Sequence, residues 1–142
     1  MNGPLKISEA TSLALHSLAL LAGVKGRQLS AKELAGMLAA SEAHLSKIMQ
    51  RMHKKGLVNS FRGPGGGFAL ALPPERIMLI DVYEEFEGPV TTTGCLLDQN
   101  VCAGGACLLG GVLGDISRKF VNYLKQTNLS EINSGIGGCL ND

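Results

Sequence analysis

A run of glycines between two short apolar segments is the feature that most restricts the fold of this 142-residue chain. Residues 57–62 read Leu-Val-Asn-Ser-Phe-Arg, and residues 68–72 read Phe-Ala-Leu-Ala-Leu, on either side of the turn Gly-Pro-Gly-Gly-Gly at 63–67. Apolar residues in alternation favour strands, and glycines accept the positive φ angles that tight turns require. Residues 57–72 are therefore predicted to form a β-hairpin, which the following Pro-Pro pair ends.

Three helices are predicted ahead of this hairpin. The first covers about residues 8–22 and has a broad apolar face. The second opens at Ser30, which forms a capping box with Glu33. The third covers about residues 42–55, has Gly56 as its expected C-cap, and places four apolar residues on one face: Leu45, Ile48, Met49 and Met52. A very short turn joins the second and third helices, as in a helix-turn-helix.

The outer face of the third predicted helix carries polar and basic side chains. They are His44, Ser46, Lys47, Gln50, Arg51 and Lys54. Such side chains donate hydrogen bonds to phosphates and base edges, although most polar helix faces only contact water. The hairpin favours DNA contact, because Arg62 at its turn would reach a minor groove or a phosphate. Binding of a nucleotide by the glycine turn is disfavoured, since neither a Lys-Ser/Thr pair nor a helix follows directly.

The charges are unevenly distributed along the chain. The net charge is only +1, but residues 1–72 carry nine Lys or Arg against three Asp or Glu, whereas residues 73–142 carry four against nine. A basic first half fits a DNA-binding module joined to a part with another task. No apolar run reaches the roughly 18 residues that a membrane span needs, and the N-terminal segment lacks the basic cluster of a signal peptide. We therefore expect a cytoplasmic protein without a membrane partner.

Two further helices and a tail are predicted after the hairpin. One helix covers about residues 75–87, and a longer amphipathic helix covers about 106–127. The apolar stripe of the long helix consists of Leu109, Val112, Leu113, Ile116, Phe120, Val121 and Leu124. We expect this stripe to form the seam of a symmetric dimer, with burial inside one chain as the alternative. The Gly-, Asn- and Ser-rich segment 128–142 is expected to be a flexible tail.

Three cysteines lie in a glycine-rich loop between these two helices, at Cys95, Cys102 and Cys107. We call residues 95–107 the cysteine loop. Six and then four residues separate the cysteines, so their sulfurs are able to converge. Thiolates are soft ligands suited to iron–sulfur clusters and zinc, and the loop lacks the paired C-x2-C knuckles of a zinc ribbon. A bare thiol switch is a further open interpretation.

The segment from Lys55 to Val90 closely resembles the winged-helix iron–sulfur regulators of the IscR/NsrR (Rrf-type) family. It reads KGLVNSFRGPGGGFALALPPERIMLIDVYEEFEGPV. The Arg-Gly-Pro-Gly-Gly-Gly wing is its most specific part, the three downstream cysteines strengthen it, and the resemblance covers nearly the whole chain. It implies a homodimeric transcription factor, typically a repressor. The third helix would enter a major groove of double-stranded DNA and the wing a minor groove.

The resemblance also implies roles for single residues. Arg62, followed by Gly63, would be the arginine that the wing inserts into DNA. Bases and phosphates would be contacted by Ala43, His44, Ser46 and Lys47, with Arg51 on the same helix. Because Ala43 and Ser46 differ from the Ser and Glu found in the family, the family's operator sequence does not transfer.

The three loop cysteines match the family's cluster ligands, although the usual spacing is five residues twice. This match implies an iron–sulfur cluster of two-iron or four-iron type, which air readily removes from the isolated protein. The family takes a fourth ligand from a histidine three residues after the third cysteine, or from an aspartate in the partner's first helix. Here those positions hold Gly110 and Ser12. The candidate fourth ligands are Glu9 or Ser12 of the partner subunit, and Cys139.

The elements together predict a mostly α-helical fold with a small β-hairpin wing. Residues 1–74 would form a winged helix-turn-helix DNA-binding domain. Residues 75–127 would form a linker helix, the cysteine loop and a long dimerisation helix. The predicted function is transcriptional regulation, in which a cluster or the redox state of the cysteines sets DNA affinity.

Three alternatives to this function are a zinc site, a cluster-free thiol switch of the same fold, and a winged-helix module that binds protein. An enzyme is disfavoured, because none of the three histidines has an acidic residue at a spacing that would indicate a catalytic pair. We therefore predict neither a catalytic residue nor a small-molecule substrate.

Overall fold

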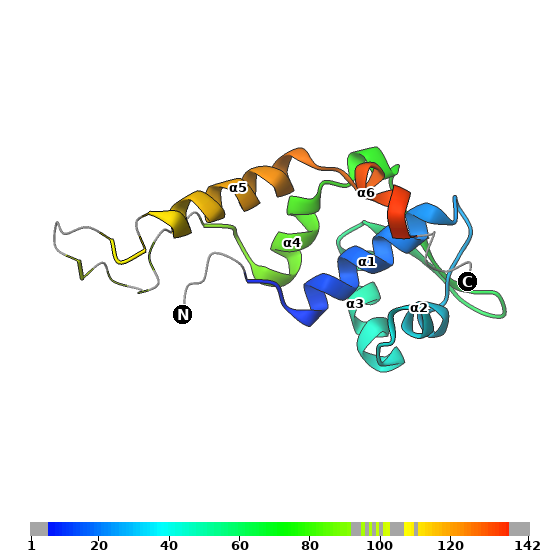
Figure 1. Cartoon of the computed structure of the whole chain (residues 1–142). Helices are drawn as coiled ribbons and strands as arrows, with labels where there is room; N and C mark the ends of the chain where they lie inside the picture. Colours follow the sequence, from blue (N-terminus) through cyan, green and yellow to red (C-terminus); the bar gives the residue numbers. More distant parts are fainter. Residues whose placement is uncertain are drawn as a thin grey trace.

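The computed structural model describes residues 6–91, 95, 97, 99, 101, 102, 107–109 and 111–136. Figure 1 shows a helical body with a two-stranded hairpin at one end and a long helix extending from the other. The elements are α1 (Glu9–Gly23), α2 (Ala31–Leu38), α3 (Glu42–Lys54), β1 (Val58–Phe61), β2 (Gly67–Leu70), the 3-10 helix η1 (Pro74–Arg76), α4 (Leu79–Glu87), α5 (Val112–Gln126) and α6 (Leu129–Ile136). The predicted mostly α-helical fold with a hairpin wing is confirmed.

Serine side chains fix the starts of the first three helices. Ser8 Oγ accepts a hydrogen bond from the Thr11 amide at 3.2 Å. Ser30 and Glu33 form the predicted capping box, with reciprocal hydrogen bonds of 2.8 and 3.0 Å. Such caps satisfy amides that a helix leaves without partners, and each stabilises by about 1 kcal/mol. At the other end of α3 the C-cap is Lys55 rather than the predicted Gly56, which follows it in the left-handed region at φ +84°.

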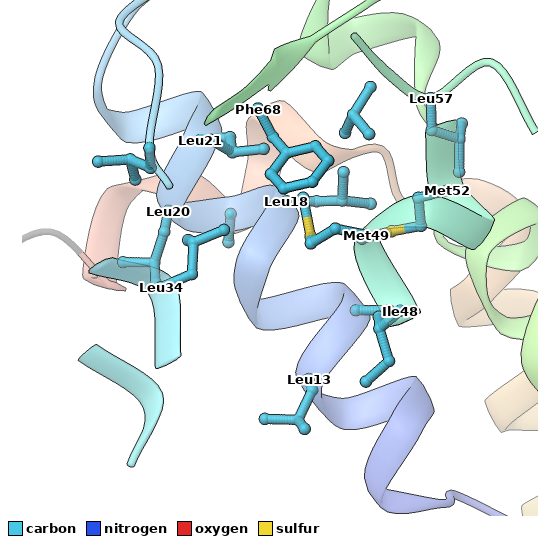
Figure 2. Packing of buried hydrophobic residues seen from close by; sticks show 14 of the residues in the cluster. Leu13, Leu18, Leu20, Leu21, Leu34, Ile48, Met49, Met52, Leu57 and Phe68 are labelled. Atoms are coloured by element: carbon cyan, nitrogen blue, oxygen red, sulfur yellow. The ribbon is translucent and has the colours of Figure 1, made fainter. Parts of the chain in front are cut away.

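The apolar core is built around α1, which contacts α2, α3, α4, α6 and β2. Figure 2 shows leucines of α1 meeting the sulfur-containing side chains of α3 and a phenylalanine of the hairpin. The central side chains are fully or almost fully buried: Leu18, Leu21, Leu34, Met49, Met52 and Phe68. Truncating one such side chain to alanine typically costs about 2–5 kcal/mol. This core holds α3 and the hairpin in one rigid unit.

The hairpin is anchored to the segment before α2. Val58 pairs with Leu70 and Phe61 with Gly67 in an antiparallel register. Leu29 adds a bridge to Phe68, with N···O distances of 3.0 and 2.8 Å. A Cβ on Gly67 would lie 2.6 Å from the Leu29 carbonyl oxygen, and its φ of +154° is strained for other residues. Only glycine therefore permits this close approach.

The segment between the hairpin and α4 differs from the expected helix over residues 75–87. The chain forms only η1 there and then extends through Ile77 and Met78 before α4 begins. Met78 bridges to Asn128, and the Ile77 carbonyl accepts from the Leu129 amide at 2.9 Å. Ile77 and Leu129 are both fully buried. The long-range pairing replaces local helical hydrogen bonds, which explains why the helix prediction was wrong at residues 77–78.

The expected flexible tail at 128–142 is wrong for its first part, because residues 129–136 form α6. The Asn128 side chain accepts from the Ser130 amide at 3.0 Å, and Glu131 accepts from the Asn128 amide at 2.7 Å. This capping resembles that of α2, except that the Asn128 side chain accepts from the second residue after it, whereas the Ser30 side chain accepts from the third. Leu129 and Ile132 pack into the core against α1. Cys139 and the rest of the predicted tail lie outside the described residues.

The long helix α5 is buried at one end and exposed at the other. Near its C-terminal end Val121 and Leu124 are buried, and the Phe120 ring packs edge-on against Tyr83 of α4 at 5.5 Å between centroids. Near its N-terminal end Val112 and Ile116 remain 47 % and 39 % exposed. Figure 1 shows this end of α5 extending away from α1. The predicted apolar stripe is thus covered within the chain over only half of its length. None of the helices in the described ranges is both long and apolar enough to cross a membrane.

Glu87, at the end of α4, ties the start of α1 to the residues that lead into the cysteine loop. Its Oε1 accepts hydrogen bonds from the Ser8 amide and the Thr11 hydroxyl, both at 2.6 Å. Nearby, the Tyr83 hydroxyl donates to the Lys6 carbonyl at 2.7 Å. Burial acts to raise the pKa of Glu87, but the hydrogen bonds from Ser8 and Thr11 and the charge of Lys6 outweigh it, so the pKa is lowered below 4.5.

This lowered pKa predicts a pH-dependent stability. Because the carboxylate is favoured in the folded state, its contribution is fully present above the unfolded-state pKa of about 4.5 and is lost as the pH falls through the folded-state value. Glu87→Gln should therefore lower Tm by a few degrees at pH 7, about 1 kcal/mol, and by less at pH 3.5. Thermal melts followed by circular dichroism would measure both differences. Glu75→Gln, an exposed position, is the control, and a pH-independent Glu87 difference would contradict the charged tie.

Candidate nucleic-acid interface

Helix α3 presents the polar face that the sequence predicts. Its four apolar residues are buried in the core, which turns the opposite side outward. Ala43 and Lys47 are exposed, and His44 and Ser46 are half-buried next to them. All four lie in the first two turns of α3, after the N-cap Ser41. The N-terminal part of a recognition helix is the part that reaches base edges in a major groove.

The hairpin turn lies beside the start of α2 and carries the predicted arginine. Arg62 follows β1 directly and is exposed, and none of the hydrogen bonds and ion pairs among the described residues occupies its guanidinium. The next residue, Gly63, has φ +87°, and its carbonyl accepts from the Gly66 amide at 2.9 Å. A Cβ on Gly66 would lie 2.6 Å from the Phe61 carbonyl oxygen. The turn is therefore tight, and it holds Arg62 at its edge.

One basic residue that the sequence analysis did not single out lies beside this turn. Arg27 lines a groove of about 740 Å³ between the start of α2 and the hairpin, together with Gly26, Gln28, Ser30, Glu33, Gly65 and Gly66. Its guanidinium is 3.9 Å from the Glu33 carboxylate, and both side chains are largely exposed. An ion pair of this kind contributes little, so Arg27 adds mobile positive charge near the wing. Only the Leu29–Phe68 pairing, which is not visible in the sequence, brings it there.

Arg51, which is also predicted to contact DNA, makes contacts with α4. Its guanidinium lies over the Phe86 ring, 4.7 Å from the centroid, and its Nε is 3.3 Å from a carboxylate oxygen of Glu85. It also donates to the backbone carbonyl of Glu85. The structure therefore directs this side chain toward α4, away from the residues at the start of α3. The amphipathic pattern of α3 gives no sign of these contacts.

The cysteine loop follows α4 and precedes α5. Cys95 is half-buried, and Cys102 and Cys107 are exposed. Among the described residues, no group of three or more His, Cys, Asp or Glu side chains is gathered as for a metal ion. Both α1 candidates for a fourth ligand lie near the start of that helix. Glu9 is exposed, and Ser12 Oγ lies 3.5 Å from His16 Nδ1. Gly110 and Cys139 lie outside the described residues.

Comparison with known proteins gives a consistent result. Residues 7–134 match the model of the Rrf2 family, described as an iron-dependent transcriptional regulator. A relative from Aquifex aeolicus, named as an HTH-type transcriptional regulator, is 29 % identical over 128 residues, which is 88 % of this chain and 89 % of the relative. The HTH-type transcriptional regulator IscR of Xenorhabdus nematophila is 32 % identical over 92 residues, covering 65 % of this chain and 56 % of IscR. The structure of CymR, the global cysteine regulator of B. subtilis, superposes with a TM-score of 0.75 at 27 % identity, over 92 % of this chain and 97 % of that one.

Proposed function

The chain belongs to the Rrf2 family of helix-turn-helix transcriptional regulators, and we propose that it binds operator DNA as a homodimer under the control of its three loop cysteines. The family and the relatives are regulators of transcription and not enzymes. One observation carries the proposal. The first turns of α3 and Arg62 at the hairpin are both attached to the same core, and both are exposed to solvent. These two elements are the ones that a winged helix uses to read DNA.

The proposed DNA contacts divide between the two grooves. Ala43, His44, Ser46 and Lys47 would meet base edges and phosphates in the major groove. Arg62, with Gly63 leaving room beside it, would enter the neighbouring minor groove, where narrow A·T-rich segments attract arginine. Arg27 would add phosphate contact from the groove beside the wing. This division predicts that Lys47 and Arg27 govern salt dependence and that Arg62 governs sequence preference.

The second copy of the chain would cover the exposed end of α5. Val112 and Ile116, at the start of this helix, expose 47 % and 39 % of their surface, and Leu109, just before the helix, exposes 39 %. Clustered apolar exposure of this kind marks an interaction site, and a two-fold axis pairs the same patch on both subunits. Two-fold symmetry also presents two α3 helices to two half-sites one helical turn of DNA apart.

The donor chemistry of the cysteine loop supports an iron–sulfur group. Three thiols within thirteen positions are soft, negatively charged ligands when deprotonated, and the family is described as iron-dependent. Cys95, Cys102 and Cys107 would hold the group, with Glu9 or Ser12 of the partner subunit as the candidate fourth ligand. When bound, such a group supplies one-electron redox chemistry and a local negative charge. The protein's own part is to connect the loop, through α4 and α5, to the DNA-reading core.

The proposal is tested by purification without oxygen and by DNA binding. We expect a visible absorption band with matching iron and sulfide, and its loss in the triple variant Cys95→Ala, Cys102→Ala, Cys107→Ala. Affinity for a duplex recovered by in vitro selection from a random library, here called the selected duplex, should change about 5- to 150-fold between the two forms. Glu75→Gln, at an exposed position away from the cysteine loop, is the control. A colourless, iron-free protein whose triple variant binds as the wild type does would contradict the cysteine-controlled part.

A thiol-based signal is the second candidate, because the fold likeness to CymR, a global cysteine regulator, extends over 92 % of this chain. In that case the protein would contain no iron, and a thiol oxidant would change its affinity for the selected duplex through oxidation of two loop cysteines to a disulfide. Iron content and the response to oxidant therefore separate the two candidates.

A further inference from the structure

Four side chains join the end of the recognition helix to the end of α4. Glu85 accepts from Arg51 Nε at 3.3 Å, and its other carboxylate oxygen is 3.7 Å from Lys55 Nζ. The Phe86 ring stacks under the Arg51 guanidinium at 4.7 Å. We call Arg51, Lys55, Glu85 and Phe86 the α3–α4 clamp. The clamp lies one turn beyond the residues proposed to read bases.

The backbone of α4 explains why arginine suits this position. The last carbonyls of a helix have no partner within the helix and carry partial negative charge. In α4, the Glu84 carbonyl accepts from the Gly88 amide, and Arg51 donates to the Glu85 carbonyl. Arg51 thus caps α4 from a different helix while its positive charge faces the negative end of the α4 dipole. A lysine could not make the side-chain, carbonyl and ring contacts at once.

Each of these ion pairs alone would contribute little to the stability of the fold, because the side chains of Arg51 and Lys55 are about half exposed. Here three contacts converge on one planar guanidinium, and Glu85 is only 22 % exposed. Both helices, α3 and α4, pack on α1, and buried side chains of both belong to the same apolar core. Outside that core, the clamp links the end of the recognition helix directly to the end of α4. Directly after α4 the chain passes through Gly88 toward the cysteine loop.

We infer that Glu85 is a positioning residue for DNA recognition: by holding Arg51 and Lys55 it sets the pose of α3 relative to α4. This inference rests on the proposed DNA-reading role of α3. Arg51 then acts within the protein and does not contact phosphate. A change at the cysteine loop that moves the end of α4 would reach the recognition helix through this clamp.

The test compares binding of full-length variants to the selected duplex and to a random-sequence duplex of equal length. Glu85→Gln and Arg51→Glu should each lower the ratio of selected to random affinity about fivefold or more. The charge-swapped double variant, Arg51→Glu with Glu85→Arg, should recover part of that ratio, because it rebuilds the ion pair but not the contacts of the guanidinium with the Glu85 carbonyl and the Phe86 ring. Asp81→Asn removes the same charge from an exposed site on α4 and should leave the ratio unchanged.

Salt titrations supply the opposing outcome. If Arg51 contacts phosphate, both Arg51→Glu and the charge-swapped double variant should show a weaker dependence of DNA affinity on salt. The double variant should then not recover any of the ratio of selected to random affinity. That result, or a Glu85→Gln ratio equal to that of the wild type, would overturn the inference. Circular dichroism melts of each variant show whether a lower affinity comes from unfolding. The inference also requires that the affinity of the charge-swapped double variant depends on salt concentration as that of the wild type does. Failure of the wild type to prefer any selected duplex would instead count against the proposed function.

Discussion

Replacing Ile116 with aspartate should leave the protein monomeric and weaken its binding to the selected duplex about 100-fold or more. Ile116 lies on the part of α5 that the chain itself does not cover. At a two-fold seam the substitution would bury a carboxylate in each subunit without a partner, which costs several kcal/mol. A monomer then engages one half-site and loses the gain from simultaneous binding of two. Analytical ultracentrifugation and fluorescence anisotropy would measure the two effects.

Asn122→Asp is the matched control for this variant. It adds the same charge to the same helix, at an exposed position off the apolar face. It should remain dimeric and should bind DNA within a few-fold of the wild type. If Ile116→Asp also stays dimeric, the exposed end of α5 is not the seam. If it becomes monomeric yet binds as tightly as before, the protein does not read DNA as a dimer.

Replacing Arg62 with alanine should weaken binding to the selected duplex by about 1–3 kcal/mol, which is about 5- to 150-fold. The side chain is exposed at a turn that the Leu29–Phe68 pairing holds in place. Since the hairpin stays intact without it, the loss should appear in DNA affinity and not in Tm. Selection repeated with the variant should recover duplexes with a relaxed preference at the minor-groove positions. Anisotropy titrations and parallel melts would establish this division.

Arg76→Ala provides the comparison, because Arg76 is an exposed arginine in η1, just beyond the hairpin. It removes the same positive charge and should cost only the general electrostatic contribution, with no change in sequence preference. Equal losses for the two variants would show that Arg62 contributes charge alone. The assignment of the turn as a DNA-inserting wing would then be wrong.

Local patterns in the sequence were sufficient for the elements that local chemistry determines. Ser30 and Glu33 are three residues apart, so their capping box is readable without the fold, and it forms as predicted. The glycine turn and its flanking strands are equally local, and their register follows. The candidate site residues on α3 and at Arg62 were predicted from polar and basic groups on a helix followed by such a turn, together with the family resemblance. Their contact with DNA stays a prediction.

Long-range contacts account for what the sequence did not predict. The pairing of Met78 with Asn128 interrupts the helix expected over residues 75–87, and no sequence pattern near residue 78 predicts this pairing. The contacts of Arg51 with α4 likewise depend on the tertiary fold. Helix α6 is different, because Asn128 and Glu131 repeat the capping signal of α2, and Leu129 and Ile132 show helical spacing. For this segment the Gly- and Asn-rich composition led to the prediction of a flexible tail, although the capping residues and the apolar spacing indicated a helix.

The packing of α6 on α1 means that the DNA-reading module is discontinuous in sequence. Its last layer, α6, comes from beyond the cysteine loop and the long helix, and it packs on α1 and beside η1 and Ile77. In a fragment that ends at residue 74, the apolar surface of α1 that α6 covers would be exposed to solvent. The segment 75–127, which contains the cysteine loop, is therefore attached at both of its ends to the same packed core, so a movement at either end acts on the body that carries α3.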